Sequence, residues 1–202
     1  NQKASQTDVT PMDITHSKVA CTLGNWVAGE YTDIFDAAEV NFDERRELAQ
    51  TIAGAMGRRA DQLIVDALSA GSTISHGSTG LTVAKITSAA KTLNDNGVPM
   101  DDRILLTSAA GIEDLLNEEK ATSADYATVR ALMSGELNTF MGFNIVMMET
   151  RAEGGLTLAS TTRDCFAFHK SSIGCAIGLD ISTEVNYIPE KTSWLSLGKY
   201  KA

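Results

Sequence analysis

Apolar residues recur at three- and four-residue spacing between Leu48 and Leu68, which is the period of one face of an α-helix. Asn41 and Glu44 can form a capping box at its start, Asp43 is a competing cap, and Gly71 ends it. At 1.5 Å per residue this helix would be about 40 Å long. Because its apolar face is narrow and many of its residues are small, we expect it to lie across a sheet as a spine. The expected contact residues are Leu48, Ile52, Ala55, Met56, Ala60, Leu63, Ala67 and Leu68.

Two extended segments are predicted ahead of this helix. The first carries alternating apolar positions between Met12 and Leu23, and the second runs from Trp26 to Tyr31. Gly24-Asn25, between them, is typical of a turn. Two strands that precede any helix predict a projecting hairpin or the edge of a sheet.

The rest of the chain changes from helical periodicity to strand-like alternation. The predicted order is β, long helix, helix, β, helix, helix and then a run of strands, which is an α+β arrangement without a βαβ repeat. The expected elements are a loop over Gly71–Gly80, a helix over Val83–Leu93 closed by Asn96-Gly97, a strand over Arg103–Thr107, helices capped by Ser108 and Ser123, a strand over Phe140–Met147 interrupted at Gly142, and strands over Leu156–Ala159, Cys165–His169, Ile173–Ile177, Ile181–Ile188 and Trp194–Tyr200.

Composition narrows the class of protein. The chain has 202 residues, of which 43% are hydrophobic and 21% are charged, so it can bury a substantial core and is neither a disordered tail nor a low-complexity fibre. Its net charge of −9 argues against sequence-independent binding to a nucleic-acid backbone, which depends on clustered lysine and arginine. No apolar run approaches the roughly 20 residues that a membrane helix needs.

The three cysteines, Cys21, Cys165 and Cys175, are widely spaced and form no CxxC pair. This spacing fits neither a disulfide framework nor a zinc site. We expect all three to be small buried apolar residues in a protein of a reducing cytoplasm.

Cys165 and His169 are the sharpest candidates for catalysis, as a nucleophile and a base. If both lie on one strand, the strand rise places them about 13 Å apart, too far for a direct hydrogen bond. We therefore interpret them as ordinary strand residues. His16 and His76 are isolated and lack the spacing of metal ligands on a helix.

Other polar groups offer weaker candidates. The paired carboxylates Glu118-Glu119 and Asp101-Asp102 lie in polar, turn-like stretches and are expected to be solvated. The loop Gly71–Gly80 could hold an anion in a backbone nest, although its composition favours a flexible connection. We predict no catalytic, cofactor-binding or metal-binding residues and no enzymatic activity.

Four motifs in one order do resemble a known family. They resemble segments of the major capsid proteins of tailed bacteriophages, which have the Hong Kong-97-type fold. The four segments of that family are the end of its spine helix, the strand and helix that lead into its axial domain, a segment with a Gly-Phe pair, and a strand near its C-terminus. In this chain they are Gly57-Arg58-Arg59-Ala60-Asp61-Gln62-Leu63-Ile64, Arg103–Thr107 leading into Leu115-Leu116, Gly135–Met147, and Phe166–Lys170 with Ile173–Ala176.

The resemblance implies an L-shaped subunit of α+β class with a long spine helix. Residues 1–23 would be part of an extended loop that reaches a neighbour, 24–80 with 179–202 a peripheral domain, and 81–178 an axial domain. Within that loop Met12–Leu23 would be the returning strand, with an N-terminal arm and the outgoing strand before it, and members commonly have a further strand after the position of Ala202.

The implied function is that of a structural coat protein that assembles into hexamers and pentamers of an icosahedral phage head enclosing DNA. The expected partners are other capsid subunits and scaffolding, portal and decoration proteins. DNA would be enclosed without specific binding, no membrane or cofactor would be involved, and the virion would assemble in the host cytoplasm. Two alternatives stay open: the shell of an encapsulin-type protein compartment, and a small cytoplasmic hydrolase or binding module that uses Cys165 and His169.

Overall fold

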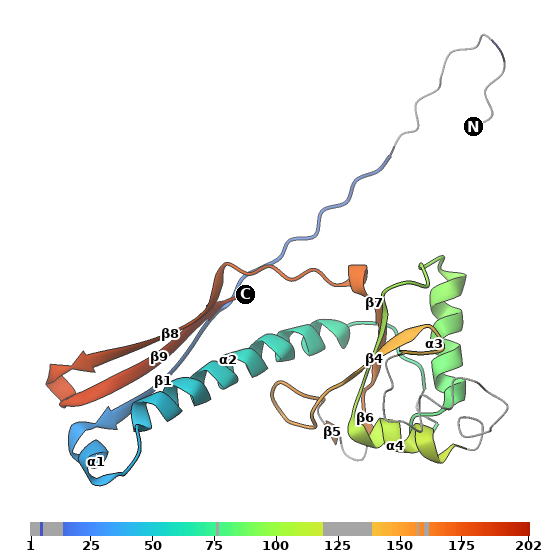
Figure 1. The fold of residues 1–202 in the computed structure, drawn as a ribbon. Coiled ribbons are helices and arrows are strands. Elements are labelled where there is room, and N and C mark those ends of the chain that lie inside the picture. Colours follow the sequence, from blue (N-terminus) through green and yellow to red (C-terminus); the bar gives the residue numbers. More distant parts are fainter. Residues whose placement is uncertain (1–4, 6–13, 76, 119–138, 157, 160–161) are drawn as a thin grey trace.

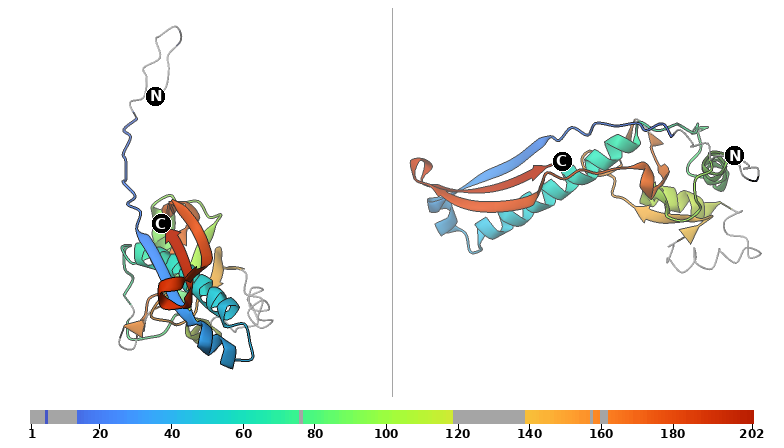
Figure 2. Two further views of the ribbon diagram at one scale, coloured as in Figure 1. Left: turned by 90° about the vertical axis from the view of Figure 1, so that its left-hand side faces the viewer. Right: turned by 90° about the horizontal axis from the view of Figure 1, so that it is seen from above.

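The computed structural model describes residues 5, 14–75, 77–118, 139–156, 158–159 and 162–202 (Figure 1). Helix α2 (Glu44–Leu68) is the long element, and its 25 residues correspond to about 38 Å. One β-sheet lies along its N-terminal half and a second β-sheet lies beyond its C-terminal end, so the body is elongated in Figure 1 and in the right-hand view of Figure 2, while the left-hand view of Figure 2 looks along its length. The predicted spine helix and the α+β class are confirmed.

The first sheet has three antiparallel strands in the order β1-β9-β8. Strand β1 (Asn25–Asp33) enters it, and β8 (Leu179–Ile188) and β9 (Ser193–Lys201) form a hairpin around the 3₁₀ turn Pro189–Lys191. The short helix α1 (Ile34–Glu39) follows β1 at the far end of the molecule (Figure 1). The sheet therefore joins the first and last parts of the described chain.

Helix α2 packs closely on the central strand β9. Ile52 and Met56 are buried there, and a Cβ atom added to Gly198 would lie 2.5 Å from Cγ2 of Ile52 and 3.3 Å from Cγ of Met56. Ser196 and Tyr200 alternate with Gly198 on the same face of β9 and are also buried. Only glycine permits this approach of helix to strand.

The second sheet has the order β3-β4-β2-β7. Strand β2 (Arg103–Thr107) pairs in parallel with β4 (Phe143–Met147) and antiparallel with β7 (Phe166–His169), while β3 (Thr139–Phe140) forms a short hairpin with β4. The remaining elements near it are α3 (Val83–Asp95), α4 (Ala109–Asn117) and the strand pair β5 (Leu158–Ala159) and β6 (Thr162–Arg163).

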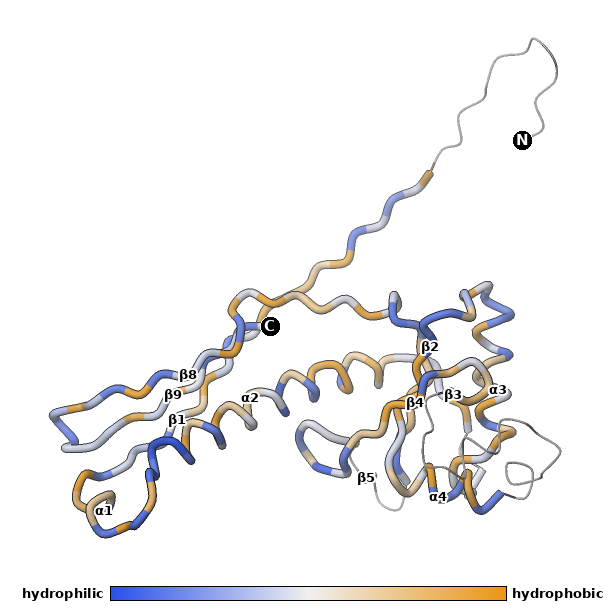
Figure 3. The backbone as a smooth tube through the Cα atoms, viewed as in Figure 1, coloured by the Kyte–Doolittle hydropathy of each residue, from blue (hydrophilic) through white to orange (hydrophobic). Residues whose placement is uncertain are grey.

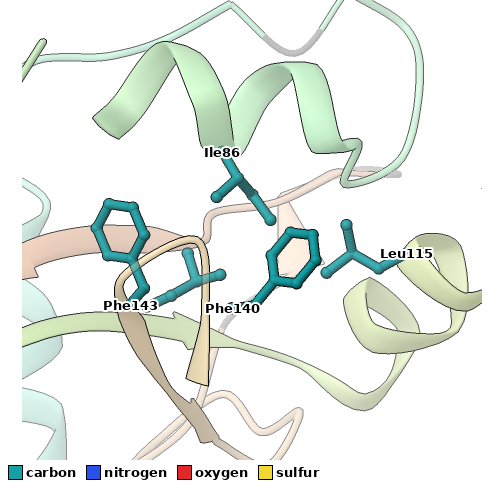
Figure 4. Packing of buried hydrophobic residues seen from close by; sticks show 5 residues of the cluster. Ile86, Leu115, Phe140 and Phe143 are labelled. Atoms are coloured by element: carbon teal, nitrogen blue, oxygen red, sulfur yellow. The ribbon is translucent and has the colours of Figure 1, made fainter. Parts of the chain in front are cut away.

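The connection from β2 to the parallel strand β4 contains α4, so the structure has one β-α-β crossover. The sequence analysis expected no βαβ repeat and did not identify this single unit. Helices α3 and α4 cover this sheet through a core of Ile86, Leu105, Leu115, Phe140 and Phe143 (Figure 4). The hairpin turn at Met141-Gly142 uses positive φ angles, which confirms the predicted interruption of this strand.

The C-terminal half of α2 joins the second sheet through different residues. Val65 packs with Leu106 and Leu156 in a separate buried cluster. Thirteen residues at 100° each place Val65 about 140° around the helix from Ile52. The predicted contact residue Leu68 also packs against this cluster, but the prediction of a single contact face is wrong, because α2 buries nearly opposite faces against the two sheets.

Arg103 is a buried anchor for the turn that precedes β2. Its guanidinium donates hydrogen bonds to the carbonyl oxygens of Pro99 and Val98, at 2.7 and 2.6 Å, and to Oδ1 of Asn94 at 2.7 Å. These acceptors lie at the C-terminal end of α3, where a cation is favoured by the helix dipole. Arg103 thus links the C-terminal end of α3 to the start of β2.

Several predicted boundaries are wrong. Residues 14–23 and Ile173–Ile177 form no strand, because both run beyond the end of β9 and no strand among the described residues pairs with them. Gly24 is not in a turn: it exchanges backbone hydrogen bonds with Ala202 at 2.7 and 3.2 Å and continues β1. Helix α2 has Asp43 as its N-cap, without a side-chain hydrogen bond, so the Asn41 capping box does not form.

Other predicted signals hold. Ser108 caps α4 by accepting from the Gly111 N–H, and α3 ends at Asn96 as expected. The helix expected after Ser123 and the first residues of the predicted N-terminal strand, Met12 included, lie outside the described residues.

The contact between α2 and β9 yields a first prediction. In Gly198→Ala the new methyl group would overlap Ile52, and we expect a loss of about 1–3 kcal/mol in the free energy of unfolding, measured by urea denaturation. Gly29→Ala in the same sheet is the control, because its methyl would lie 3.2 and 3.4 Å from the side-chain ends of Leu197 and Leu195, which can move aside, and at an ordinary contact distance of 3.4 Å from the Ser196 carbonyl oxygen. Equal midpoints for the two variants would contradict the assigned packing.

Candidate assembly surfaces

The structure separates the two candidate catalytic residues. Cys165 lies beside Thr107, with 3.3 Å between Sγ and Oγ1, while His169 is the partner of Arg103 at the opposite end of β2. The rise of that strand keeps the two side chains about 13 Å apart. Nδ1 of His169 instead lies 2.7 Å from Oγ of Ser171. Cys165 and His169 therefore lie too far apart for direct proton transfer between them.

The other polar candidates have structural partners. Glu118 accepts a hydrogen bond from the Val83 N–H at 2.6 Å, so this carboxylate supports the first turn of α3, while Glu119 lies outside the described residues. In the loop before α3, Nζ of Lys85 donates to the carbonyl oxygens of Thr79 and Gly80. Carbonyl oxygens directed at a cation are the reverse of an anion-binding nest.

Asp101 and Asp102 are exposed in a turn, as expected of solvated carboxylates. Within the described ranges no group of three or more His, Cys, Asp or Glu residues could hold a metal ion. None of the helices described is both long and apolar enough to cross a membrane.

The expectation that all three cysteines are buried is wrong. Cys165 is half-buried, whereas Cys21 and Cys175 are exposed in the segments that run past the end of β9. No element in the described part of the chain covers these segments, so small apolar residues in them reach solvent.

The chain exposes far more surface than a compact protein of its mass. Its accessible surface is 14,215 Å², whereas a folded monomer of 21.6 kDa is expected to expose about 9,200 Å². The elongated body and the projecting segment of residues 14–23 contribute to the excess (Figures 1 and 2). A shape of this kind leaves a large surface in contact with water unless other chains cover part of it.

Both outer strands of the first sheet offer unpaired edges. In the described part of the chain β1 and β8 each pair only with β9. Strand β8 is ten residues long and exposes Leu179, Ile181, Val185 and Tyr187. A long apolar edge of this kind is a template for pairing with a further chain.

The face of this sheet opposite α2 is also uncovered. We call it the open face; Val27, Tyr31, Leu195 and Leu197 lie there, with Val27 66% exposed. Two lysines accompany these residues: Nζ of Lys191 lies 3.9 Å from the ring centre of Tyr31, and Nζ of Lys199 lies 2.8 Å from Oε2 of Glu184. The hydrogen bond from Lys199, together with its charge, lowers the pKa of the Glu184 carboxyl.

A groove of about 380 Å³ lies at the end of the molecule beside α1, and we call it the tip groove. Its walls are largely apolar, and charged residues stand where α2 begins. Phe35, on the same short helix, is 71% exposed, and Phe42 is 61% exposed. The groove is lined by Ile34, Ala37, Ala38, Phe42, Asp43, Glu44, Arg45 and Trp194.

A second hollow of about 340 Å³ lies beside Met147 and Met148 at the start of α4. Neither hollow gathers the convergent polar groups of an enzyme pocket. The sequence analysis assigned no role to Phe35 and Phe42. The sequence places both aromatic residues in an acidic stretch, but it does not show that they are exposed.

The buried end of β9 gives a prediction on pH. Burial raises the pKa of the Tyr200 phenol, and the nearby Cys175 and Asp180 raise it further. A raised folded-state pKa means that the stabilisation is complete below the ordinary value of about 10 and is lost as the pH rises through the raised value. We expect Tyr200→Phe to reduce the loss of stability between about pH 9 and 11, measured by urea midpoints. The exposed Tyr31→Phe is the control, and an unchanged alkaline loss in Tyr200→Phe would contradict this assignment.

Comparison with solved structures shows that this fold is similar to that of chains from bacteriophages. A chain from Mycobacterium phage Che8 aligns with a TM-score of 0.70 and 20% identity, covering 88% of this chain and 65% of that chain. A chain of the capsid structure of cyanophage P-SCSP1u aligns with a TM-score of 0.66 and 16% identity, covering 100% of this chain and 74% of the other. This chain therefore spans less than two thirds of the Che8 chain.

A chain from the mature capsid of bacteriophage PhiM1 aligns with a TM-score of 0.55 and 11% identity over 100% of this chain and 73% of the other. No curated protein sequence matches this chain. A sequence model described as phage capsid protein, however, matches residues 1–202. Exposed edges, apolar faces and the capsid-like fold agree with this match, and the chain belongs to the phage capsid protein family.

Proposed function

We propose that this chain is the structural subunit of an icosahedral phage head, forming hexamers and pentamers that enclose DNA. The family match over residues 1–202 carries the proposal. The large accessible surface of 14,215 Å² supports it, because a shell subunit is covered on several sides by its neighbours. The negative net charge of −9 suits a container that must not hold DNA tightly.

The proposal divides the subunit as the sequence predicted. Residues 24–80 with 179–202 form a peripheral domain and 81–178 form an axial domain, while 1–23 belong to an extended loop. Strand pairing supports this division, since the first sheet uses only strands from the peripheral ranges and the second sheet only strands from the axial range.

One axial segment also contacts the spine. The Gly154 N–H donates to Oε1 of Gln62 at 3.0 Å, and the Glu153 carboxylate lies 3.7 Å from Arg59. The guanidinium of Arg59 lies in turn over the ring of Trp26, at 3.8 Å from its centre. These contacts tie the loop after β4 to α2 and β1, so the two proposed domains would move together at this point.

We assign no enzymatic activity, because Cys165 and His169 lie at opposite ends of β2. Other copies of this chain are the primary partners, with scaffolding, portal and decoration proteins as further ones, and no membrane is involved. The host cytoplasm is the proposed place of assembly, and the virion is the final location.

Electron microscopy of the full-length gene product tests the proposal. We expect uniform icosahedral particles, because the exposed edges and apolar faces need neighbours. Particles from infected cells should contain DNA, whereas an encapsulin-type compartment would contain a protein cargo. A product that sediments only as a monomer or small oligomer under all assembly conditions would contradict the shell function.

A further inference from the structure

The three cysteines of the chain differ in their surroundings. Cys165 is half-buried and lies beside Thr107 at the second sheet, whereas Cys21 and Cys175 are exposed. Cys21 belongs to the segment of residues 14–23, which leads into β1, and Cys175 belongs to the segment of residues 173–178, which leads into β8. Two of the three thiols are therefore accessible in the segments that precede the two outer strands of the first sheet.

Both segments reach the first sheet at the same end. Strands β1 and β8 each run antiparallel to β9 and are thus parallel to one another, so the segments that lead into them approach from the same side (Figure 1). Gly24 exchanges backbone hydrogen bonds with Ala202, and the Gly178 N–H donates to the Lys201 carbonyl oxygen at 2.8 Å. The two segments therefore begin on either side of the end of β9.

Side chains of the two segments meet where β9 stops separating them. A Cβ atom added to Gly178 would lie 2.9 Å from Cδ1 of Leu23, so the leucine side chain spans the gap. Burial and then the nearby Cys175 raise the pKa of the Tyr200 phenol, which places Cys175 close to this end of β9. A contact between the two segments thus already exists at their base.

Both exposed cysteines lie close to this contact along the chain. Cys21 is two residues before Leu23, and Cys175 is three residues before Gly178. In extended form these separations are about 7 and 10 Å. No strand in the described part of the chain pairs with either segment, so each can turn and move inward. A disulfide needs Cα atoms roughly 4.4–6.8 Å apart, which segments already touching at their base reach by a small inward movement.

The apolar composition of the segments favours this movement. Val19 is 95% exposed and Ile177 is 55% exposed. Figure 3 shows hydrophobic residues along both segments where they approach the end of β9. Moving the segments together removes part of this apolar surface from water. The two thiols are therefore brought together by an approach that is favourable before any covalent bond forms.

We propose that Cys21 and Cys175 form an intrachain disulfide that links the segment of residues 14–23 to the segment of residues 173–178 across the end of β9. The oxidant is a small disulfide such as oxidised glutathione. One cysteine thiolate attacks it, which releases one glutathione thiolate and leaves a mixed disulfide; the second cysteine thiolate then displaces the second glutathione thiolate. Two protein thiols are oxidised, and one glutathione disulfide is reduced to two thiols.

The redox state of the surroundings sets the timing of this bond. Thiols stay reduced in the cytoplasm, whereas disulfides persist at the surface of a virion outside the cell. The segment of residues 14–23 would be free to move during assembly and covalently held at its base afterwards. This timing rests on the proposed shell function, while formation of the bond requires only the chain itself.

Peptide mapping of the full-length protein tests the bond. The protein is purified with its thiols reduced, equilibrated with a mixture of reduced and oxidised glutathione, alkylated and digested with trypsin. The three cysteines fall in different tryptic peptides, 19–45, 164–170 and 171–191. We expect peptide 19–45 to be joined to peptide 171–191, with a mass two hydrogens below the sum of the reduced peptides, and we expect a monomer band on a non-reducing gel.

Three single variants provide matched controls, because each leaves a different pair of thiols. Cys165→Ser keeps the proposed pair and should be oxidised to the same extent as the unsubstituted protein. Cys21→Ser and Cys175→Ser leave only pairs with Cys165, for which we expect at least about tenfold less intrachain disulfide at the same glutathione ratio. Equal oxidation of the three pairs, or covalent oligomers joined through Cys21 and Cys175, would overturn the proposal.

Thermal unfolding measures whether the bond holds the two segments together. The Cys165→Ser protein should have a higher midpoint when oxidised than after reduction, because the bond closes a long loop of the chain. Adding Cys21→Ser should remove this difference, and equal midpoints in the first comparison would overturn the assigned role. The peptide map does not depend on particles, so failure of the full-length product to form particles would defeat the shell function alone.

Discussion

The arrangement of the whole chain depends on one helix that packs against two sheets with nearly opposite faces. At its N-terminal half Ile52 and Met56 sit on Gly198 of β9, and at its C-terminal half Val65 packs with Leu106 and Leu156. Because each sheet holds only one end of α2, the two sheets share no common core. The body is therefore long and thin, and its core is divided among separate buried groups, one between α2 and the first sheet and two at the second sheet.

A thin body leaves apolar surface uncovered. The first sheet is covered by α2 on one side only, both of its outer strands have free edges in the described chain, and the tip groove is unfilled. In an isolated soluble protein these features would favour aggregation. In a protein whose family builds capsids, the same features are surfaces for contact between subunits, and assembly removes them from water.

The sequence predicted the elements that local pattern determines. The 3.6-residue period gave α2, the Ser108 cap gave the start of α4, and the apolar run Arg103–Thr107 gave β2. Tertiary context decided the rest. Val65 could not be predicted as a contact residue, because a single amphipathic stripe does not show that a helix changes its buried face along its length.

The sequence also did not show which segments would have a neighbouring strand to pair with. Residues 14–23 and 173–177 have the composition of strands, yet a strand forms only beside another strand, and β9 ends before both segments. The exposure of Cys21 and Cys175 follows from the same fact. For the candidate site, strand spacing already argued against a direct hydrogen bond between Cys165 and His169, although the sequence left a module that uses them as an alternative. Phe35 and Phe42 needed the fold, because only the structure shows that they are exposed among the described residues.

Hydrogen exchange on the unassembled chain and on assembled particles tests the central claim most directly. If neighbouring subunits complete the exposed surfaces, backbone amides of residues 14–23, of the outer edge of β8 and of α1 will exchange rapidly in the free chain and slowly in the particle. Amides of α2 at Ile52 and Met56 will be protected in both. Slow exchange of residues 14–23 already in the free chain, or equal exchange of all three regions in both states, would contradict the account.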